Sequence, residues 1–307
     1  MTSTKFDMVT IIGATATGKT EVAVNLTYKL NGEIISADSR QVYRKMDIGT
    51  GKDLETYRIH GIEVPHHLVD IADAGYQYNV FEYQRDFLKV YQDLKARDVF
   101  PVLCGGSGMY IEAVLKGYRM IQVPVDESRR SELQLLSLDQ LTEILKTYKT
   151  INNTSDIENK KRAVRAIEIE EYRIAHPEAD FSFPSIQSLM IGVKYDRDSR
   201  RTRITSRLKQ RLENGMIEEV KQLLESGLKP EDLTYYGLEY KYLTLYITGQ
   251  LSFNEMESGL NTAIHQFAKR QMTWFRKMER EGFTIHWLDG YMPIDEKIDK
   301  ILSLLNR

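Results

Sequence analysis

The octapeptide Gly13-Ala14-Thr15-Ala16-Thr17-Gly18-Lys19-Thr20 decides the fold, because it matches the phosphate-binding pattern G-x-x-x-x-G-K-[ST]. It follows an apolar stretch, 8–12, that we expect to be a buried strand, and it precedes a helical stretch, 19–30. In such a loop the backbone N–H groups turn inward around a phosphate, and the N-terminus of the next helix adds partial positive charge. Lys19 would reach the outer phosphates, and the Thr20 hydroxyl could bind Mg²⁺. The motif predicts a di- or triphosphate site without identifying the compound.

Short β-branched runs alternate with amphipathic stretches around this motif, which is typical of a parallel sheet built from βαβ units. We expect further strands at 33–37, 99–104 and 188–193, and helices at 80–97, 198–226, 231–248, 252–281 and near the C-terminus. Residues 126–180 are polar and favour helices. The predicted fold class is therefore α/β: a P-loop NTPase-like parallel sheet core flanked by helices, with a small helical insertion domain. The expected division is 1–122 with 186–307 for the core and 123–185 for the insertion.

Composition excludes several classes of protein. The chain has 307 residues, of which 42% are hydrophobic, so wholesale disorder is excluded. The single cysteine, Cys104, excludes a disulfide framework and a multi-cysteine zinc site and fits a cytoplasmic location. No run approaches the roughly 18 apolar residues that span a bilayer. With 42 basic and 44 acidic residues the net charge is −2, a total that by itself argues against a nucleic-acid partner.

The distribution of charge gives a different indication. Residues 194–211 hold eight basic side chains and only two acidic ones, and 159–165 hold four more cations. A third basic cluster, 269–277, surrounds Trp274 and Phe275. One such cluster is usually a solvated helix face. Three in a slightly acidic chain predict a basic face with a nucleic acid or several phosphates opposite it.

Other candidate residues carry less specific signals. Asp38 directly follows the second expected strand, where it could be a general base, a metal ligand or the cap of the next turn. The pair His66-His67 is expected to lie in a loop or the core, and Asp70 is a weak match to a Walker-B carboxylate. The tyrosines at 235, 236, 240, 242 and 246 are expected to serve helix packing rather than base stacking.

With these residues in view, the sequence resembles the tRNA dimethylallyltransferase (isopentenylpyrophosphate transferase) family, in its bacterial type. The resemblance runs from about Met8 to Leu288 and rests on ordered motifs: GATATGKT (13–20), ISADSRQVYRKMDIGTGK (35–52), PHHLVDI (65–71), GGSGMYIEAVL (105–115), NKKRAVRAIEI (159–169), ENGMIEEVKQLL (213–224) and AKRQMTWFRK (268–277). The chain departs from the usual family residues at Ala14, Thr17, Ser107 and within 236–241.

The resemblance implies transfer of a dimethylallyl group from dimethylallyl diphosphate to N6 of the adenine at tRNA position 37, beside the anticodon. It implies Mg²⁺ as cofactor and the tRNA anticodon stem-loop as partner. Nothing in the sequence requires more than a monomer. The implied catalytic residues are Asp38, Thr20, Arg203 and Arg207, with the diphosphate on residues 13–20 and the metal on Thr20. The implied tRNA-binding residues are Asp38, Ser39, Arg40, Gln41, Ser107, Arg130, Lys161, Arg162, Ala163, Val164, Arg165, Lys269, Arg270 and Gln271.

Three other hypotheses compete with this one. A P-loop small-molecule kinase would bind ATP in the same loop and use Asp38 to activate an acceptor hydroxyl, but it leaves the three basic clusters unexplained. An isoprenyl transferase acting on free adenine nucleotides would share most of the site. A non-catalytic RNA-binding protein with a vestigial loop is the remaining possibility.

Overall fold

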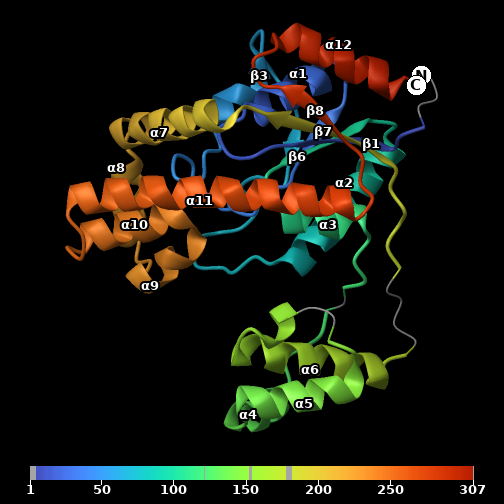
Figure 1. The fold of residues 1–307 in the computed structure, drawn as a ribbon, viewed down its shortest axis with the longest axis vertical. Helices are drawn as coiled ribbons and strands as arrows, with labels where there is room; N and C mark the ends of the chain where they lie inside the picture. The colour runs from blue at the N-terminus through green and yellow to red at the C-terminus, as the bar shows by residue number, and fades with distance from the viewer. Residues whose placement is uncertain (1–4, 121, 152–153, 178–181, 307) are drawn as a thin grey trace. The chain divides into compact units, whose positions relative to one another are not determined.

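The computed structural model describes residues 5–120, 122–151, 154–177 and 182–306 (Figure 1). The chain divides into two compact units, Met1–Tyr118 with Pro184–Arg307 and, between them in sequence, Arg119–Phe183. Among the described residues, no helix has the length and apolar character needed to cross a membrane.

A six-stranded parallel sheet forms the centre of the first unit. Its order is β5-β2-β6-β1-β7-β8, and every neighbouring pair is parallel. The strands are β1 (Met8–Ile12), β2 (Glu33–Ser36), β5 (His66–His67), β6 (Pro101–Gly105), β7 (Ser188–Lys194) and β8 (Ile285–Asp289). Every residue of β1 and β6 is buried, which explains why these strands read as continuous apolar runs. The predicted parallel sheet is confirmed.

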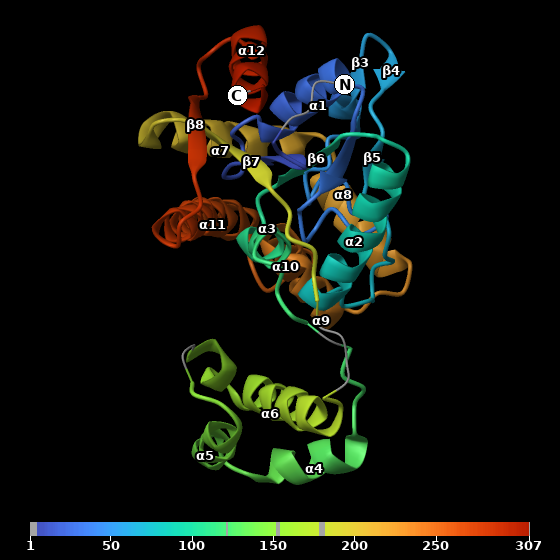
Figure 2. The same cartoon turned by 90° about the vertical axis from the view of Figure 1, so that its right-hand side faces the viewer.

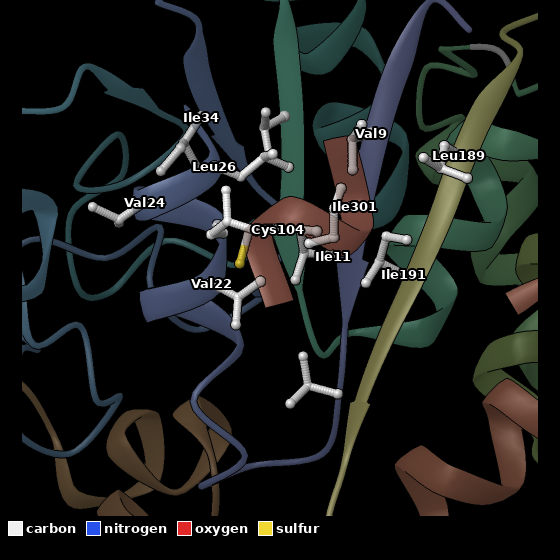
Figure 3. Packing of buried hydrophobic residues seen from close by; sticks show 14 of the residues in the cluster. Val9, Ile11, Val22, Val24, Leu26, Ile34, Cys104, Leu189, Ile191 and Ile301 are labelled. Atoms are coloured by element: carbon white, nitrogen blue, oxygen red, sulfur yellow. The ribbon is translucent and has the colours of Figure 1, made fainter. Parts of the chain in front are cut away.

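Helices cover both faces of this sheet (Figure 2). On one face α1 (Lys19–Leu30) and α12 (Ile294–Leu305) pack on alternate strand residues such as Ile11, Ile191 and Cys104 (Figure 3). On the other lie α2 (Val80–Ala96), α3 (Gly108–Leu115) and α11 (Phe253–Arg280). Capping boxes start α2 at Asn79 and α11 at Ser252, satisfying N–H groups that the helix itself leaves unpaired.

Two of the expected helices are each divided in the structure, and several short elements are additional to those expected. The predicted helix 198–226 is two helices, α7 (Arg197–Glu213) and α8 (Met216–Glu225), because Gly215 takes a left-handed φ of 93° between them. The predicted helix 231–248 is likewise divided into α9 (Pro230–Leu233), the 3-10 turn η3 (Thr234–Tyr236) and α10 (Leu238–Ile247). Strands β5 and β8, the 3-10 turn η1 (Leu54–Tyr57) and the hairpin β3 (Arg58–Ile59)–β4 (Ile62–Glu63) were not anticipated.

The second unit is a small helical bundle. It contains α4 (Glu127–Leu135), α5 (Leu138–Tyr148), the 3-10 turn η2 (Thr154–Ile157) and α6 (Lys160–Ala175). Its own apolar core consists of Leu133, Leu141, Leu145, Ala163, Val164, Ala166 and Ile167. An apolar core of its own allows a short helical insertion to fold as a separate unit.

Candidate active site

The phosphate-binding loop connects β1 to α1, in the context that the motif requires. Ala16 and Gly18 both take left-handed backbone conformations, with φ of 62° and 76°. Such a conformation at a non-glycine residue costs roughly 1–2 kcal/mol and turns consecutive N–H groups toward one side. The Thr17 hydroxyl donates to the Ala14 carbonyl (2.9 Å), and this hydrogen bond within the loop stabilises its conformation. The loop therefore has the form of an anion cradle at a helix N-terminus.

A cavity of about 700 Å³ opens beside this loop. The loop side supplies Lys19 and Thr20, α7 supplies Arg203 and Arg207, and the segment before η1 supplies Asp53. The full lining is Ala16, Thr17, Gly18, Lys19, Thr20, Glu21, Asp53, Thr56, Thr202, Arg203, Ser206, Arg207 and Gln210. From the predicted diphosphate set, Gly13, Ala14 and Thr15 are not in this wall. The Ala14 carbonyl accepts the Thr17 hydroxyl, and the Thr15 N–H donates to Gln271 of α11. The cavity has the size and charge for a diphosphate.

Two arginines one helical turn apart face this cavity, as their spacing predicts. Arg203 donates from Nε to the Ala16 carbonyl (2.9 Å), and its guanidinium stacks over Tyr195 at 4.5 Å. Arg207 donates from Nη2 to Asp53 (2.5 Å). Arg203 is thereby fixed to the phosphate-binding loop itself, whereas Arg207 is held by a carboxylate that an incoming anion would have to displace.

The segment 47–53, which carries Asp53, is positioned by a carboxylate of α8. Glu219 accepts the backbone N–H groups of Asp47, Ile48 and Gly49 at 2.8, 2.7 and 3.0 Å, and the Tyr240 hydroxyl at 2.7 Å. Gly51 has a φ of 69°, and a methyl group there would overlap Nη2 of Arg211. The close approach of backbone to guanidinium requires glycine at this position.

Asp38 lies just beyond the carboxyl end of β2, next to the end of β6. Its Oδ1 accepts the N–H of Arg40 (3.0 Å), so one carboxylate oxygen caps the turn. Ser107 joins the two strand ends: its Oγ accepts the Ser39 N–H (2.9 Å), and its N–H donates to the Ala37 carbonyl (3.2 Å). A methyl group at Gly105 would overlap that carbonyl oxygen. The turn-capping role that the sequence allowed is present, and it uses one of the two carboxylate oxygens.

The charges around the cavity act on one another. Burial lowers the pKa of Lys19, the Asp38 carboxylate opposes that shift, and the Arg207 and Arg211 cations add to it. Burial raises the pKa of Cys104 to about 11, although Lys19 acts in the opposite direction. The thiol is therefore neutral near pH 7. Asp38, Lys19 and the arginines belong to one electrostatic site.

A second, smaller cavity of about 20 Å³ lies behind the loop. Thr15, Ala16, Arg211 and Glu239 contribute to its lining. Within the described part of the chain, Nε and Nη2 of Arg211 are buried without a hydrogen-bond partner. Burial lowers the pKa of Arg211 to about 10 and raises that of Glu239. The volume suffices for one water between these groups.

No sequence motif assigns a site role to Asp53, Arg211 or Glu239. Arg211 continues the four-residue spacing of Arg203 and Arg207, so the helical period held a signal for it. Asp53 directly follows the quoted motif 35–52, but nothing local indicates that it pairs with α7.

Among the predicted tRNA-binding residues of the first unit, the structure separates surface residues from buried ones. Arg40 lies over the ring of the partly exposed Tyr235 at 5.5 Å, and Gln41 donates to the Gly51 carbonyl (3.1 Å). Lys269 and Arg270 are exposed on α11. Gln271 is buried, and its amide binds the Thr15 N–H and the Gly106 carbonyl. Its side chain is therefore used inside the protein.

In the second unit the same comparison leads to a correction. Lys161 and Arg162 are exposed at the start of α6. Ala163 and Val164 belong to the apolar core, so their side chains cannot contact RNA. Arg130 and Arg165 both bind the Glu168 carboxylate, at 2.7 and 2.8 Å. Part of the positive charge expected from cluster 159–165 is thus neutralised by an acidic residue one turn away.

The other weak candidates have structural partners. Asp70 binds the buried Lys52, and His67 lies 2.6 Å from Glu33. Among the described residues, no group of three or more His, Cys, Asp or Glu side chains is arranged to hold a metal ion. Tyr236 and Tyr240 are buried, which agrees with the prediction that they serve helix packing.

Comparison with known proteins adds the family. The pattern of the family described as IPP transferase matches residues 41–278, and that described as isopentenyl transferase matches 6–62. The chain is 60% identical over 305 residues to "tRNA dimethylallyltransferase 2" of Bacteroides fragilis (strain YCH46), covering 99% of both chains. It is 50% identical over 289 residues to the protein of the same name from Trichlorobacter lovleyi, covering 94% and 93%.

Solved structures agree with these relatives. The tRNA isopentenylpyrophosphate transferase of Bacillus halodurans has a TM-score of 0.70 and 31% identity, covering 98% of this chain and 95% of that one. A eukaryotic dimethylallyltransferase solved as it acts on tRNA has a TM-score of 0.76 at 22% identity and shares the fold. With the phosphate-binding loop, the paired arginines and Asp38 arranged as described, the chain belongs to the IPP transferase family of tRNA dimethylallyltransferases.

Proposed function

We propose that this protein transfers a dimethylallyl group from dimethylallyl diphosphate to N6 of adenine 37 in tRNA, forming N6-isopentenyladenosine. The observation that carries this is the placement of Asp38 and the phosphate-binding loop at the carboxyl ends of β2 and β1, two strands of one sheet on either side of β6, with the charges of Asp38 and Lys19 acting on each other. A nucleophile bound at Asp38 and a leaving group bound in the loop would then face each other across the strand ends.

The diphosphate is held by the loop N–H groups, by Lys19, and by Arg203 and Arg207. As the bond between the allylic carbon and oxygen breaks, negative charge grows on the departing diphosphate. Cations already fixed around that position stabilise the transition state more than the ground state. Arg203 is held by Ala16 and Tyr195, so little reorganisation is needed. Arg207 exchanges its pairing with Asp53 for the diphosphate.

The residues around the cavity fit a magnesium ion. The Thr20 hydroxyl and the Glu21 and Asp53 carboxylates all line it, and oxygen atoms of this kind are the ligands that Mg²⁺ prefers, usually together with substrate phosphates. Bound there, Mg²⁺ would neutralise part of the diphosphate charge. Thr20 is the residue best placed by the loop motif to hold it.

Asp38 serves as the general base. It accepts a hydrogen bond from the exocyclic amine of the adenine and takes up the proton as the new bond from nitrogen to carbon forms. Its Oδ1 is held by the Arg40 N–H, which fixes the orientation of the carboxylate. Ser39 and Ser107 tie the turn to the end of β6.

The tRNA is bound through exposed or partly exposed cations and aromatic groups. Arg40 with Tyr235, and Lys269 with Arg270, provide these on the first unit; Lys161 and Arg162 provide them on the second. The target adenine lies in a loop, so extruding it costs less than unpairing a base in a duplex. The near-neutral total charge favours recognition by fit to one folded RNA over nonspecific attraction.

The reaction is tested by incubating the protein with Mg²⁺, dimethylallyl diphosphate and either unmodified bacterial tRNA or AMP, followed by digestion and mass spectrometry. N6-isopentenyladenosine from tRNA and not from AMP supports the proposal. Product from AMP alone assigns the protein to free adenine nucleotides. ATP-dependent phosphorylation of a metabolite without prenylation refutes it in favour of a kinase.

The Asp38→Asn variant tests the assigned base with the turn preserved, because the amide oxygen still accepts the Arg40 N–H. We expect the rate of the bound complex to fall by about 10²–10⁴-fold with tRNA affinity unchanged. Loss of tRNA binding would assign Asp38 a structural role instead.

A further inference from the structure

We propose that Gln271 is a positioning residue that holds the phosphate-binding loop at a fixed distance from the turn carrying Asp38. This inference rests on the proposed function, because it concerns the geometry between the prenyl donor and the base. Gln271 lies on α11, and its side chain is 7% exposed between the loop 13–18 and the loop 105–108.

Both ends of the Gln271 amide are used. Its Oε1 accepts the N–H of Thr15 (2.9 Å), and its Nε2 donates to the carbonyl of Gly106 (2.9 Å). One partner is a donor and the other an acceptor, so a carboxamide satisfies both, whereas a carboxylate or an ammonium satisfies only one. Since a buried amide without partners is costly, the two bonds fix the rotamer and with it the gap between the two loops.

The contact with Gln271 favours glycine at position 106. A methyl group on Gly106 would overlap Nε2 of Gln271. The amide therefore reaches the backbone directly, at a position where a side chain would displace it. The contact spans 165 residues of sequence, so local structure does not create it.

The connection continues from Gly106 to Asp38. The next residue, Ser107, accepts the Ser39 N–H on its Oγ (2.9 Å) and donates its own N–H to the Ala37 carbonyl (3.2 Å). Asp38 lies between these two partners and its Oδ1 binds the Arg40 N–H. From Thr15 to Asp38, each step is a covalent bond or a hydrogen bond. The base and the donor site are thus joined by a short path through one side chain.

The same contact uses one amide of the phosphate-binding loop inside the protein. The Thr15 N–H points to Gln271, and the cavity lining on the loop side starts at Ala16. Breaking the contact would free the Thr15 end of the loop and shift the diphosphate relative to Asp38. A displacement of about 1 Å between reacting groups lowers the rate by about 10²-fold.

The test compares Gln271→Met and Gln271→Glu with the wild type in single-turnover prenylation of saturating tRNA, together with tRNA affinity. Gln222→Glu, the same change at an exposed position of α8, is the matched control. For Gln271→Met we expect a rate about 10–100-fold lower, with a tRNA dissociation constant within about threefold of the wild type. Gln222→Glu should match the wild type in both.

The pH profile of Gln271→Glu separates positioning from a general loss of structure. In this variant the ionised carboxylate would still accept the Thr15 N–H but would place an oxygen against the Gly106 carbonyl; when protonated, the carboxyl group can donate to that carbonyl. We expect the ratio of variant to wild-type rate to rise at least about threefold from pH 8.5 to pH 6. A ratio independent of pH overturns the proposal, even if Gln271→Met fails to fold.

Two further outcomes would also overturn it. If tRNA affinity falls in Gln271→Met while the rate at saturation is unchanged, Gln271 is an RNA contact. If both quantities match the wild type, the bridge has no role in the reaction. Absence of product from the wild type itself would instead mean that the proposed function has failed, which keeps the two failures distinct.

Discussion

The buried ammonium of Lys52 holds the segment that shapes the site, and its removal has a calculable cost. Lys52 is 1% exposed; its Nζ donates to the Tyr43 carbonyl (2.6 Å), to Asp47 (2.5 Å) and to Asp70. Lys52→Met keeps the length of the side chain and removes all three bonds. The site depends on this segment, because it leads from Asp38 to Gly51 and Asp53.

The magnitude follows from the exposure of each partner. The buried Tyr43 carbonyl is left unpaired, which costs about 1–3 kcal/mol. The carboxylates of Asp47 and Asp70 are 50% and 35% exposed, so they regain water and add only about 0–1 kcal/mol each. Relief of the desolvation of the ammonium offsets part of this loss. We expect a net loss of about 2 kcal/mol, or roughly 4–8 °C in Tm for a unit of this size.

Urea unfolding at pH 7.5 measures this loss through the fluorescence of Trp274 and Trp287, which both belong to the first unit. Lys45→Met, an exposed lysine of the same segment, is the control and should change the unfolding free energy by less than about 0.5 kcal/mol. A loss below about 1 kcal/mol in Lys52→Met would refute the reasoning, since it would mean that the ammonium only balances its own desolvation.

Three other expectations follow from single residues. Arg211→Met removes a largely buried cation whose Nε and Nη2 make no hydrogen bond among the described residues and whose nearest carboxylate, Asp53, is 4.0 Å away, so the KM for dimethylallyl diphosphate should rise about 3–10-fold without loss of stability; an unchanged KM contradicts this. Because its pKa is raised to about 11, Cys104 should react with iodoacetamide at pH 8 at least about 100-fold more slowly in the folded protein than in urea; equal rates would show an accessible thiolate. A hydrogen bond from the Arg97 guanidinium lowers the pKa of Glu33 to about 2; burial opposes this shift and His67 adds to it. The ionised carboxylate therefore stabilises the fold fully above about pH 4.5, and this stabilisation is lost as the pH falls toward 2. Glu33→Gln should therefore cost about 1–2 kcal/mol in urea unfolding at pH 7 and almost nothing near pH 2.5; an equal cost at both pH values would exclude this linkage.

Local sequence was sufficient wherever chain neighbours determine the conformation. The strand 8–12, the loop 13–18 and the helix 19–30 were predicted to the residue, because an apolar run, the glycine motif and an amphipathic helix are each encoded within a few positions. The sequence pattern does not predict the helix boundaries at Gly215 and Gly237, although glycine stands at both, because apolar periodicity continues across them.

The charge clusters show the limit of counting residues. Sequence placed cations at 159–165, 194–211 and 269–277, and the structure shows which of them are available. Arg165 is paired with Glu168, which also binds Arg130 outside these clusters, whereas Lys269 and Arg270 are exposed. The Arg165–Glu168 pair lies within α6 at a spacing of three residues, which the sequence shows. The Arg130–Glu168 pair joins α4 to α6, and the sequence does not reveal it.

The sequence by itself therefore determined the fold class, the phosphate-binding loop and the residues able to act as base and clamp, because these follow from local backbone preference and residue chemistry. Only the tertiary structure decided how they are held together. β8 completes the sheet beside β7, Glu219 fixes the segment 47–49 from about 170 positions away, and Gln271 joins the loops of two strands. Each of these contacts is made between groups far apart in sequence, and its stability comes from burial that exists only after the chain has folded.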